Sequence, residues 1–144
     1  MNPIPINYLA VLVCGVFSMV LGFLWYGPFF SKPWMKYMGI TKADMEKFKA
    51  SGKSMGPSYG FMFAASLIMA FVLAHSLIFA SAYLQVEGIP AGLQAGFWNW
   101  LGFVMPATLG SVLFEKKHWK VWVINLGYYL VLLCGMGVIL ALWK

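Results

Sequence analysis

Three polar side chains, His75, Asn99 and Asn125, stand out because each lies inside a long apolar stretch of the chain. Where such a stretch crosses a bilayer a polar group is costly, so it needs a partner or a purpose. His75 can change its charge near neutral pH and could therefore handle a proton or a substrate in the middle of the protein. The plainer alternative is a neutral His75 that joins two helices through a hydrogen bond.

His75 and Asn99 are expected to lie at the same depth. His75 comes nine residues before the end of the stretch 59–84, and Asn99 comes ten residues after the start of the stretch 89–114. With a rise of 1.5 Å per residue, each lies roughly 14 Å from the same boundary. A tight turn joins the two stretches, so their helices should be neighbours. A hydrogen bond between His75 and Asn99 is then sterically reasonable.

Pro106 leaves a carbonyl of its own helix without a partner, because proline has no N–H to donate to Gly102. Asn125 lies at a similar depth in the next apolar stretch, 119–143. Its side-chain amide could therefore satisfy the Gly102 carbonyl and fix a kink. Alternatively, the amide and the free carbonyl could line a polar pocket.

The sequence offers no pattern for catalysis or for a metal site. All four acidic residues lie outside the apolar stretches, and the two histidines, His75 and His118, should lie on opposite sides of a membrane. Cys14 and Cys134 form no CxxC pair, and there is no phosphate-binding loop or dinucleotide motif. We therefore expect no enzyme, no catalytic residue, no metal and no cofactor.

Composition identifies the class of protein in which these side chains lie. Of 144 residues, 62% are hydrophobic and 10% are charged, whereas a soluble domain carries about 25% charged residues. Four stretches, at about 8–30, 59–84, 89–114 and 119–143, are long enough to cross a bilayer. We expect an all-α integral membrane protein, a four-helix transmembrane bundle that forms one domain over 1–144.

Two sets of small residues could let these helices pack closely. Gly15, Ser18 and Gly22 form a stripe in the first stretch, and Gly92 and Gly96 form a GxxxG motif in the third. The motif could face the first helix, the second helix or another copy of the chain. A single bundle of four helices has little interior, so we expect a homo-oligomer, with any pore lying between protomers.

The segment 31–56 is the one long polar region. Thr41 and Asp44 have the spacing of a capping box, which predicts a short amphipathic helix from about Lys42 to Ala50. Such a helix would lie on the membrane surface with its lysines toward anionic lipid headgroups; a solvated loop is the alternative. The lysines expected to contact headgroups are Lys32, Lys36, Lys42, Lys47 and Lys49.

Lysine placement predicts the orientation. The segment 31–56 holds six lysines and the turn after the third stretch holds Lys116 and Lys117, while the turn at 85–88 holds none. Lysine-rich loops belong in the cytoplasm, so both termini should lie outside. Nine of the ten lysines lie in or beside these two loops. The net charge of +6 therefore indicates a basic membrane face rather than a nucleic-acid surface.

Several aromatic and glycine-rich segments resemble a known family. The segment Leu24–Pro28, of sequence LWYGP, and the following Pro33–Trp34 are similar to one signature of the bacterial membrane family DUF1761, a domain of unknown function. Gly96–Phe103 and Ile124–Tyr128 resemble its second signature. The likeness spans almost the whole chain. It implies a small four-helix protein of the bacterial inner membrane, with no known activity and no catalytic residues.

Two classes of function remain. The first, which we favour, is a homo-oligomeric transporter or channel for a small solute or ion, with His75, Asn99 and Asn125 along the path, because polar groups recur in three stretches beside a proline kink. The second is a non-transporting interaction protein that binds lipid or another membrane protein through its glycine faces and its basic surface. Neither class names a small-molecule ligand.

Overall fold

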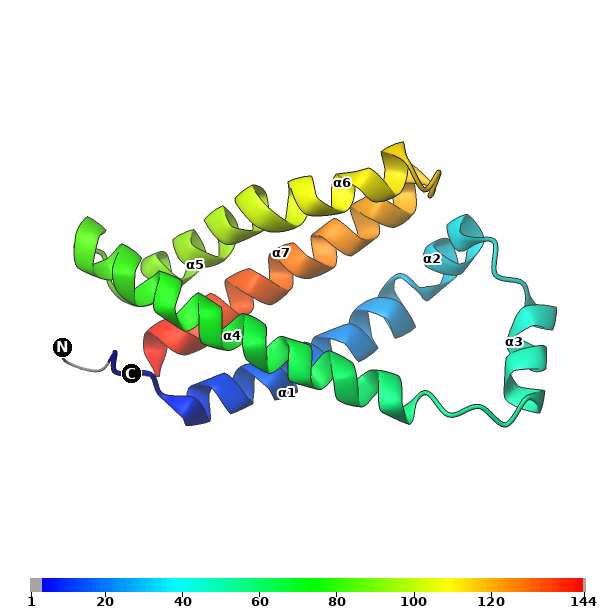
Figure 1. Ribbon diagram of the computed structural model, residues 1–144, viewed down its shortest axis with the longest axis horizontal. Helices are drawn as coiled ribbons and strands as arrows, with labels where there is room; N and C mark the ends of the chain where they lie inside the picture. The colour runs from blue at the N-terminus through cyan, green and yellow to red at the C-terminus, as the bar shows by residue number, and fades with distance from the viewer. Residues whose placement is uncertain (1–3, 144) are drawn as a thin grey trace.

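The computed structural model describes residues 4–143, which form helices and no β-strand. Four long helical runs lie side by side, and the chain enters α1 and leaves α7 at the same end of the molecule (Figure 1). In chain order the runs are α1 (Tyr8–Leu24) with the π-helical turn η1 (Trp25–Phe29); α4 (Gly56–Leu84); α5 (Gly88–Asn99), the π-helical turn η2 (Trp100–Val104) and α6 (Met105–Leu113); and α7 (Trp119–Leu142).

Three of these helices are long and apolar enough to cross a membrane: Tyr8–Phe29, Gly56–Leu84 and Trp119–Leu142. The predicted all-α class is therefore confirmed. The third predicted stretch is also helical, from Gly88 to Leu113, but it is divided by η2. Its role as a fourth crossing stays a prediction.

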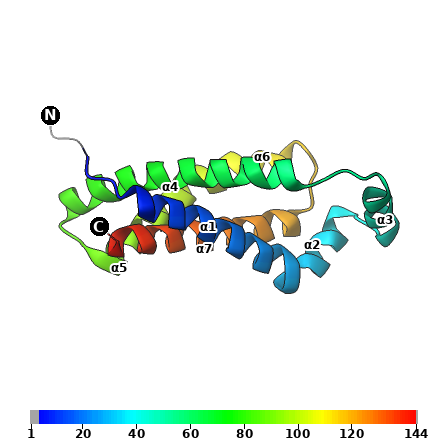
Figure 2. The same ribbon diagram turned by 90° about the horizontal axis from the view of Figure 1, so that it is seen from below.

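Two short helices lie at the other end of the molecule from the start of α1 (Figures 1 and 2). Over Lys42–Ala50 the chain forms α3, the predicted short helix, and its capping box is present. The Thr41 N–H donates to Asp44 Oδ2 at 2.9 Å, and the Asp44 N–H donates to Thr41 Oγ1 at 3.2 Å. The position of α3 on a membrane surface stays a prediction.

The other short helix, α2 (Ser31–Met38), was not predicted. It ends at Gly39, whose φ of 72° lies in the left-handed region where glycine is favoured. Pro33 lies in its first turn, where a missing N–H costs no helical hydrogen bond. Pro33 and Gly39 could have predicted the start and the end of α2. They were overlooked because the polar composition of 31–56 suggested a loop.

The GxxxG motif lies against α7 of the same chain, which corrects our expectation of the first helix, the second helix or another copy. A side chain added at Gly92 would collide with the backbone of Gly137. A Cβ added at Gly96 would come within 2.5 Å of the Leu133 carbonyl oxygen. The two backbones approach this closely because α7 offers its own glycine opposite Gly92.

The stripe on α1 faces side chains of α4 and α7 of the same chain. A Cβ at Gly15 would lie 2.7 Å from Leu67 of α4, and one at Gly22 would lie 3.5 Å from the Tyr128 hydroxyl of α7. Between them, Ser18 Oγ and Ser66 Oγ share a hydrogen bond of 2.6 Å. The GxxxG face and the Gly15–Ser18 part of the stripe are thus occupied inside one chain, while Gly22 is only partly buried.

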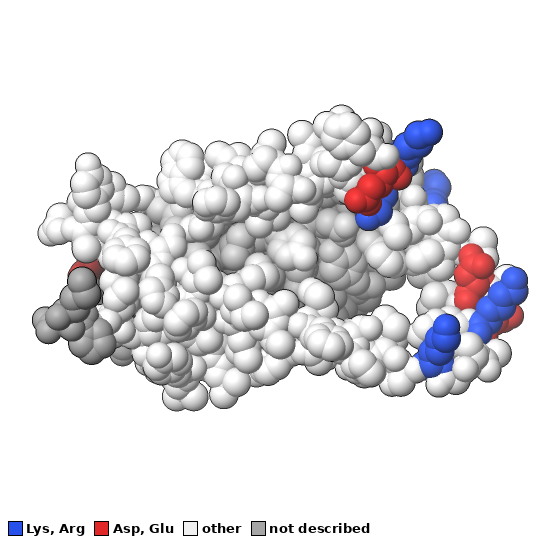
Figure 3. Space-filling view, in the orientation of Figure 1, with Lys and Arg blue, Asp and Glu red and all other residues white. Residues whose placement is uncertain are grey.

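The tightest packing lies midway along the helices. Cys14, Ser66, Leu132 and Met136 are each less than 2% exposed. The lysines lie elsewhere: those of the described residues are confined to 31–56 and 116–120. In Figure 3 the lysines of the visible face gather at the end that carries α3. We call this the lysine end.

Candidate functional site

Two tryptophans hold the same part of α7 from two different elements. Trp25 begins η1 and donates its indole N–H to the Ile124 carbonyl at 3.1 Å. Trp100 begins η2 and donates its indole N–H to the Leu126 carbonyl at 2.9 Å. π-Helical turns inside helices frequently mark functional sites. Asn125 lies between the two residues whose carbonyls accept these hydrogen bonds.

Each π-helical turn has a proline beside it. Pro28 lies inside η1, and Pro106 follows η2 in the first turn of α6. Proline interrupts the regular hydrogen-bond ladder of an α-helix because it lacks an N–H. The sequence thus predicted a disturbance near Gly102 correctly, but the structure absorbs it as a widened turn.

Asn125 accepts a hydrogen bond from the Tyr26 hydroxyl, at 2.7 Å. This is the one side-chain hydrogen bond of Asn125 among residues 4–143, so the predicted bond from its amide to the Gly102 carbonyl is not formed. A Cβ added at Gly102 would meet no other part of the described chain within 4 Å, apart from its chain neighbours and the adjacent backbone of its own helix. Tyr26 is closer in the fold because η1 turns its side chain toward α7.

The predicted His75–Asn99 hydrogen bond is also replaced by others. His75 Nδ1 lies 2.9 Å from the Phe71 carbonyl, one turn back on its own helix. Asn99 Nδ2 donates to Ser76 Oγ at 2.8 Å and to the Ala95 carbonyl at 2.8 Å. The prediction named the correct helix pair and depth but the wrong residue of α4. The three predicted polar side chains therefore do not form one site.

Asn125 instead belongs to a group of tyrosines that the sequence analysis missed. The Tyr26 ring lies 5.3 Å from that of Tyr128 and 5.8 Å from that of Trp34, measured between centroids. Tyr128 donates its hydroxyl to the Ser18 carbonyl at 3.2 Å. From the sequence, Tyr26 resembles an aromatic residue of the membrane–water interface, because it follows Trp25 near the end of an apolar stretch. The sequence feature that could have predicted this group is the pair Tyr128 and Tyr129, two phenols well inside a long apolar stretch.

Two cavities share wall residues of this group. The first, which we call the aromatic cavity, measures about 540 Å³ and lies between α1, η1, the start of α4 and α7. The second, the donor cavity, measures about 320 Å³ and lies between η1, α2 and α7. Tyr26 and Tyr129 line both. The aromatic cavity is lined by Ser18, Met19, Gly22, Phe23, Tyr26, Gly27, Tyr59, Met62, Tyr128 and Tyr129.

The donor cavity adds an indole, an amide and an ammonium to the two tyrosines that it shares with the aromatic cavity. Trp34 Nε1 is buried and has no hydrogen-bond partner in the described part of the chain. The side-chain oxygen of Asn125 is taken by Tyr26. Lys117 also lines this cavity and pairs with Glu115 at 2.8 Å, with both side chains at least half exposed. Asn125 and Tyr129 further border a neighbouring cavity of about 410 Å³ beside α6.

A basic aromatic cluster lies nearby at the lysine end. Lys120 Nζ donates to the Tyr37 hydroxyl at 2.9 Å, and this hydrogen bond lowers the pKa of Tyr37 below its ordinary value. The Tyr37 ring stacks on His118 with centroids 4.6 Å apart. His118 in turn caps α7 by accepting from the Lys120 N–H. The cluster links α2 to the first turn of α7. Both helices also line the donor cavity.

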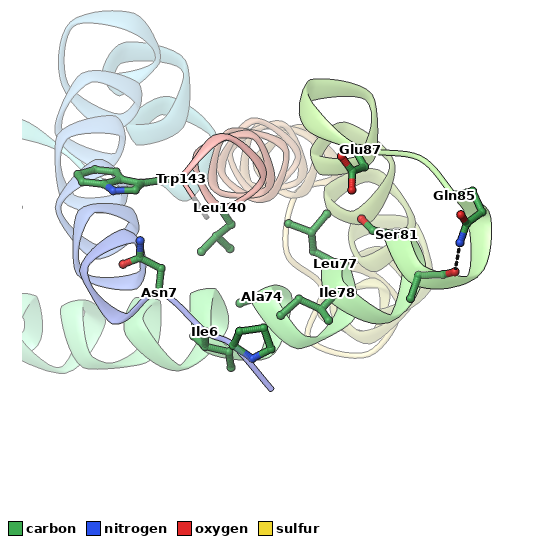
Figure 4. Close-up of a pocket in the computed structure, with 12 residues that line it drawn as sticks. Ile6, Asn7, Ala74, Leu77, Ile78, Ser81, Gln85, Glu87, Leu140 and Trp143 are labelled. Carbon is green, nitrogen blue, oxygen red and sulfur yellow. Dashed lines mark hydrogen bonds between the residues drawn. The ribbon is translucent and has the colours of Figure 1, made fainter. Parts of the chain in front are cut away.

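A separate cavity of about 500 Å³ lies at the other end of the molecule. Figure 4 shows its apolar wall of Leu77, Ile78 and Leu140, with Glu87 and Trp143 at its border. Along α1, α4 and α7 the buried layer of Cys14, Ser66, Leu132 and Met136 comes between this end cavity and the aromatic cavity.

Groups that could hold a metal ion are not found among residues 4–143: no three His, Cys, Asp or Glu side chains come together. Cys14 and Cys134 are both free thiols. The polar groups of the two cavities are phenols, a serine hydroxyl, an indole, an amide and an ammonium, which bind by hydrogen bonds and charge.

The fold and the site together define a class: an all-helical protein with three helices apolar enough to cross a membrane and with cavities at its lysine end. The family model described as "Protein of unknown function (DUF1761)" matches residues 9–141. The chain belongs to this family, so the resemblance noted in the sequence is confirmed. No curated protein and no solved structure matches the chain.

Proposed function

We propose that this protein is a four-helix protein of the bacterial inner membrane with its lysine end in the cytoplasm and both termini outside. The run Gly88–Leu113 supports the fourth crossing, because its residues would span ~39 Å at 1.5 Å each. That exceeds the ~30 Å of a hydrocarbon core. The placement of the lysines supports the orientation.

Its function, in this proposal, is to bind an amphipathic molecule from the cytoplasmic leaflet. One observation carries this: Tyr26, which lines both cavities, hydrogen-bonds Asn125 in the wall of the donor cavity. Ligand pockets are mostly apolar with a few placed polar groups. The aromatic cavity would take the apolar part of the molecule, and the donor cavity would take its polar end.

Native mass spectrometry of the protein released from lipid nanodiscs tests this function. Gly22→Leu fills the aromatic cavity, and a Cβ at Gly22 meets Tyr128 only at ordinary contact distance. Gly60→Leu is the matched control, because a Cβ at Gly60 finds open space and Gly60 is not part of the cavity wall. We expect the wild type and Gly60→Leu to retain one amphiphile that Gly22→Leu loses. Equal retention by all three proteins would contradict the proposal.

Transport of the bound molecule, the function favoured from the sequence, is the second candidate. The observation in its favour is that α1, α4 and α7 carry cavities at both ends with buried core between them that includes the layer of Cys14, Ser66, Leu132 and Met136. Transport would require this layer to open. A cysteine pair at Ser18 and Ser66, whose hydroxyls are 2.6 Å apart, could lock the layer by a disulfide. We expect the oxidised pair to stop movement of a fluorescent phospholipid between vesicle leaflets and a reductant to restore it.

The proposed binding does not require the expected homo-oligomer, since all the residues named for the two cavities belong to one chain. Lys32 and Lys36 of α2, with Lys42, Lys47 and Lys49 of α3, remain the proposed contacts for anionic headgroups. The same native mass spectra report the mass of the assembly, and a single chain that carries amphiphile would support binding without an oligomer.

A further inference from the structure

We infer that the donor cavity is an oxyanion site, which binds a phosphate or carboxylate group at the polar end of the bound molecule. This inference rests on the proposed function and specifies the chemistry of its ligand. It starts from Trp34, whose buried indole N–H has no partner among residues 4–143. An indole N–H can only donate, so only an acceptor can satisfy it. Buried polar groups left without a partner are rare in proteins and point to a missing ligand, ion or water.

Trp34 is held in place by its surroundings. It lies on α2, and its ring meets that of Tyr26 edge to face at 71°. The Lys120–Tyr37 hydrogen bond fixes α2 against α7. The unsatisfied donor therefore sits in a wall that the rest of the fold positions.

Asn125 adds donors to the same cavity. Its Oδ1 already accepts the Tyr26 hydroxyl proton, at 2.7 Å. An amide has two N–H donors besides its carbonyl oxygen. The amide nitrogen of Asn125 has no partner within the described chain, so it remains available to an acceptor. The Tyr129 hydroxyl, which also lines the cavity, can donate a further bond.

Lys117 supplies the charge. Its ion pair with Glu115 is exposed, and exposed pairs contribute little because water and ions screen them. The ammonium can therefore turn to a ligand at small cost. No carboxylate lines the donor cavity itself. Three neutral donors and one ammonium favour an acceptor with negative charge, since hydrogen bonds to ionised acceptors are the stronger ones.

An anionic phospholipid headgroup and a free phosphorylated solute both present this chemistry. The junction with the aromatic cavity distinguishes them, because only the lipid has an apolar chain to place there. Three probes separate the sources: dodecyl phosphate, inorganic phosphate and dodecyltrimethylammonium, which has the same chain and the opposite charge.

NMR of the protein with ¹⁵N-labelled tryptophan indoles can follow these probes directly. Trp34→Phe assigns the Trp34 resonance. Trp25 and Trp100 serve as internal controls, because their indoles already donate to carbonyls of α7. We expect dodecyl phosphate to move the Trp34 signal downfield and to leave those of Trp25 and Trp100 in place. Dodecyltrimethylammonium should not move it.

Variants then test the donors. Asn125→Asp keeps an acceptor for Tyr26 but removes the amide donor and adds a negative charge. We expect it to weaken dodecyl phosphate binding by about tenfold or more. Lys117→Gln should weaken it by a smaller factor, and Lys116→Gln, at a neighbouring lysine outside the cavity wall, should leave it unchanged. Unmoved Trp25 and Trp100 signals would show that each variant is folded.

A shift of Trp34 with dodecyl phosphate alone supports a lipid-type headgroup, and a shift with inorganic phosphate as well supports a free oxyanion. If neither anion moves Trp34, or if Asn125→Asp binds as tightly as the wild type, the oxyanion site is overturned. In that case, a loss of the amphiphile in Gly22→Leu would still support the proposed function. The two experiments therefore distinguish a failure of this inference from a failure of the proposed function.

Discussion

Trp25 and Trp100 donate to α7 carbonyls only two residues apart, although the tryptophans come from two different π-helical turns. The carbonyls belong to Ile124 and Leu126, so the two indoles bracket Asn125. A carbonyl oxygen has two lone pairs and can accept an indole N–H while it stays in its helix. This bracket fixes the part of α7 that carries the Tyr26–Asn125 junction.

The bracket predicts unequal effects of tryptophan substitutions. Trp25→Phe and Trp100→Phe each remove one hydrogen bond to α7, so each should lower the free energy of unfolding by ~1 kcal/mol. Trp98→Phe is the control, because Trp98 is 61% exposed and has no hydrogen bond of its side chain within residues 4–143. Titration with a denaturing detergent measures all three. A loss in Trp98→Phe as large as in Trp100→Phe would count against the bracket.

The close approach of α5 and α7 predicts a strong effect of a single methyl group. A Cβ at Gly96 would lie 2.5 Å from the Leu133 carbonyl, and backbone cannot move aside as a flexible side chain can. Gly96→Ala should therefore destabilise the protein by ~3 kcal/mol, at the upper end of typical overpacking costs. Gly60→Ala, where nothing lies within 4 Å, should be nearly neutral. Similar stabilities for the two variants in the same detergent titration would exclude the observed helix contact.

The partner of Asn99 can be tested by a double-mutant cycle. Asn99 bonds Ser76 across two helices, whereas His75 bonds the Phe71 carbonyl of its own helix. Asn99→Ala and Ser76→Ala should therefore couple by ~0.6 kcal/mol, the average for such bonds between membrane helices. Asn99→Ala and His75→Ala should be additive. Coupling to His75 instead of Ser76 would restore the pairing expected from the sequence.

The capping box of α3 predicts a pH dependence. Hydrogen bonds from Thr41 lower the pKa of Asp44 below its ordinary value. A carboxyl group with a lowered pKa stabilises the folded form above its ordinary pKa, and that stability is lost as the pH falls through the lowered one. At pH values below about 4, the hydrogen-exchange protection of the first turn of α3 should therefore decrease. Asp44→Asn should remove this dependence, whereas Glu46→Gln should keep it. A pH-independent wild type would contradict the capping role.

Much of the fold followed from the sequence for simple reasons. Apolar stretches of this length must satisfy their backbone groups internally, so they form helices. Thr41 and Asp44 predicted α3 to the residue because a capping box acts locally. The turns η1 and η2 were not predicted, because a Trp-x-Gly run beside a proline does not distinguish a widened turn from a kink.

The site was harder to predict because it depends on helix rotation. Successive residues of a helix point about 100° apart. The depth of Asn99 therefore predicted the correct level of α4. The rotation of α4 about its axis determines that Ser76, and not His75, faces Asn99. Asn125 was named for its chemistry, but its partner Tyr26 comes from η1, a turn that the sequence did not show.

The most direct test of the central claim is an experimental structure of the protein in a lipid nanodisc made from bacterial lipids. We expect elongated density through the aromatic cavity that ends in the donor cavity, between Trp34 and Asn125. An aromatic cavity that is closed, or that holds only water, would contradict the proposed binding of an amphiphile.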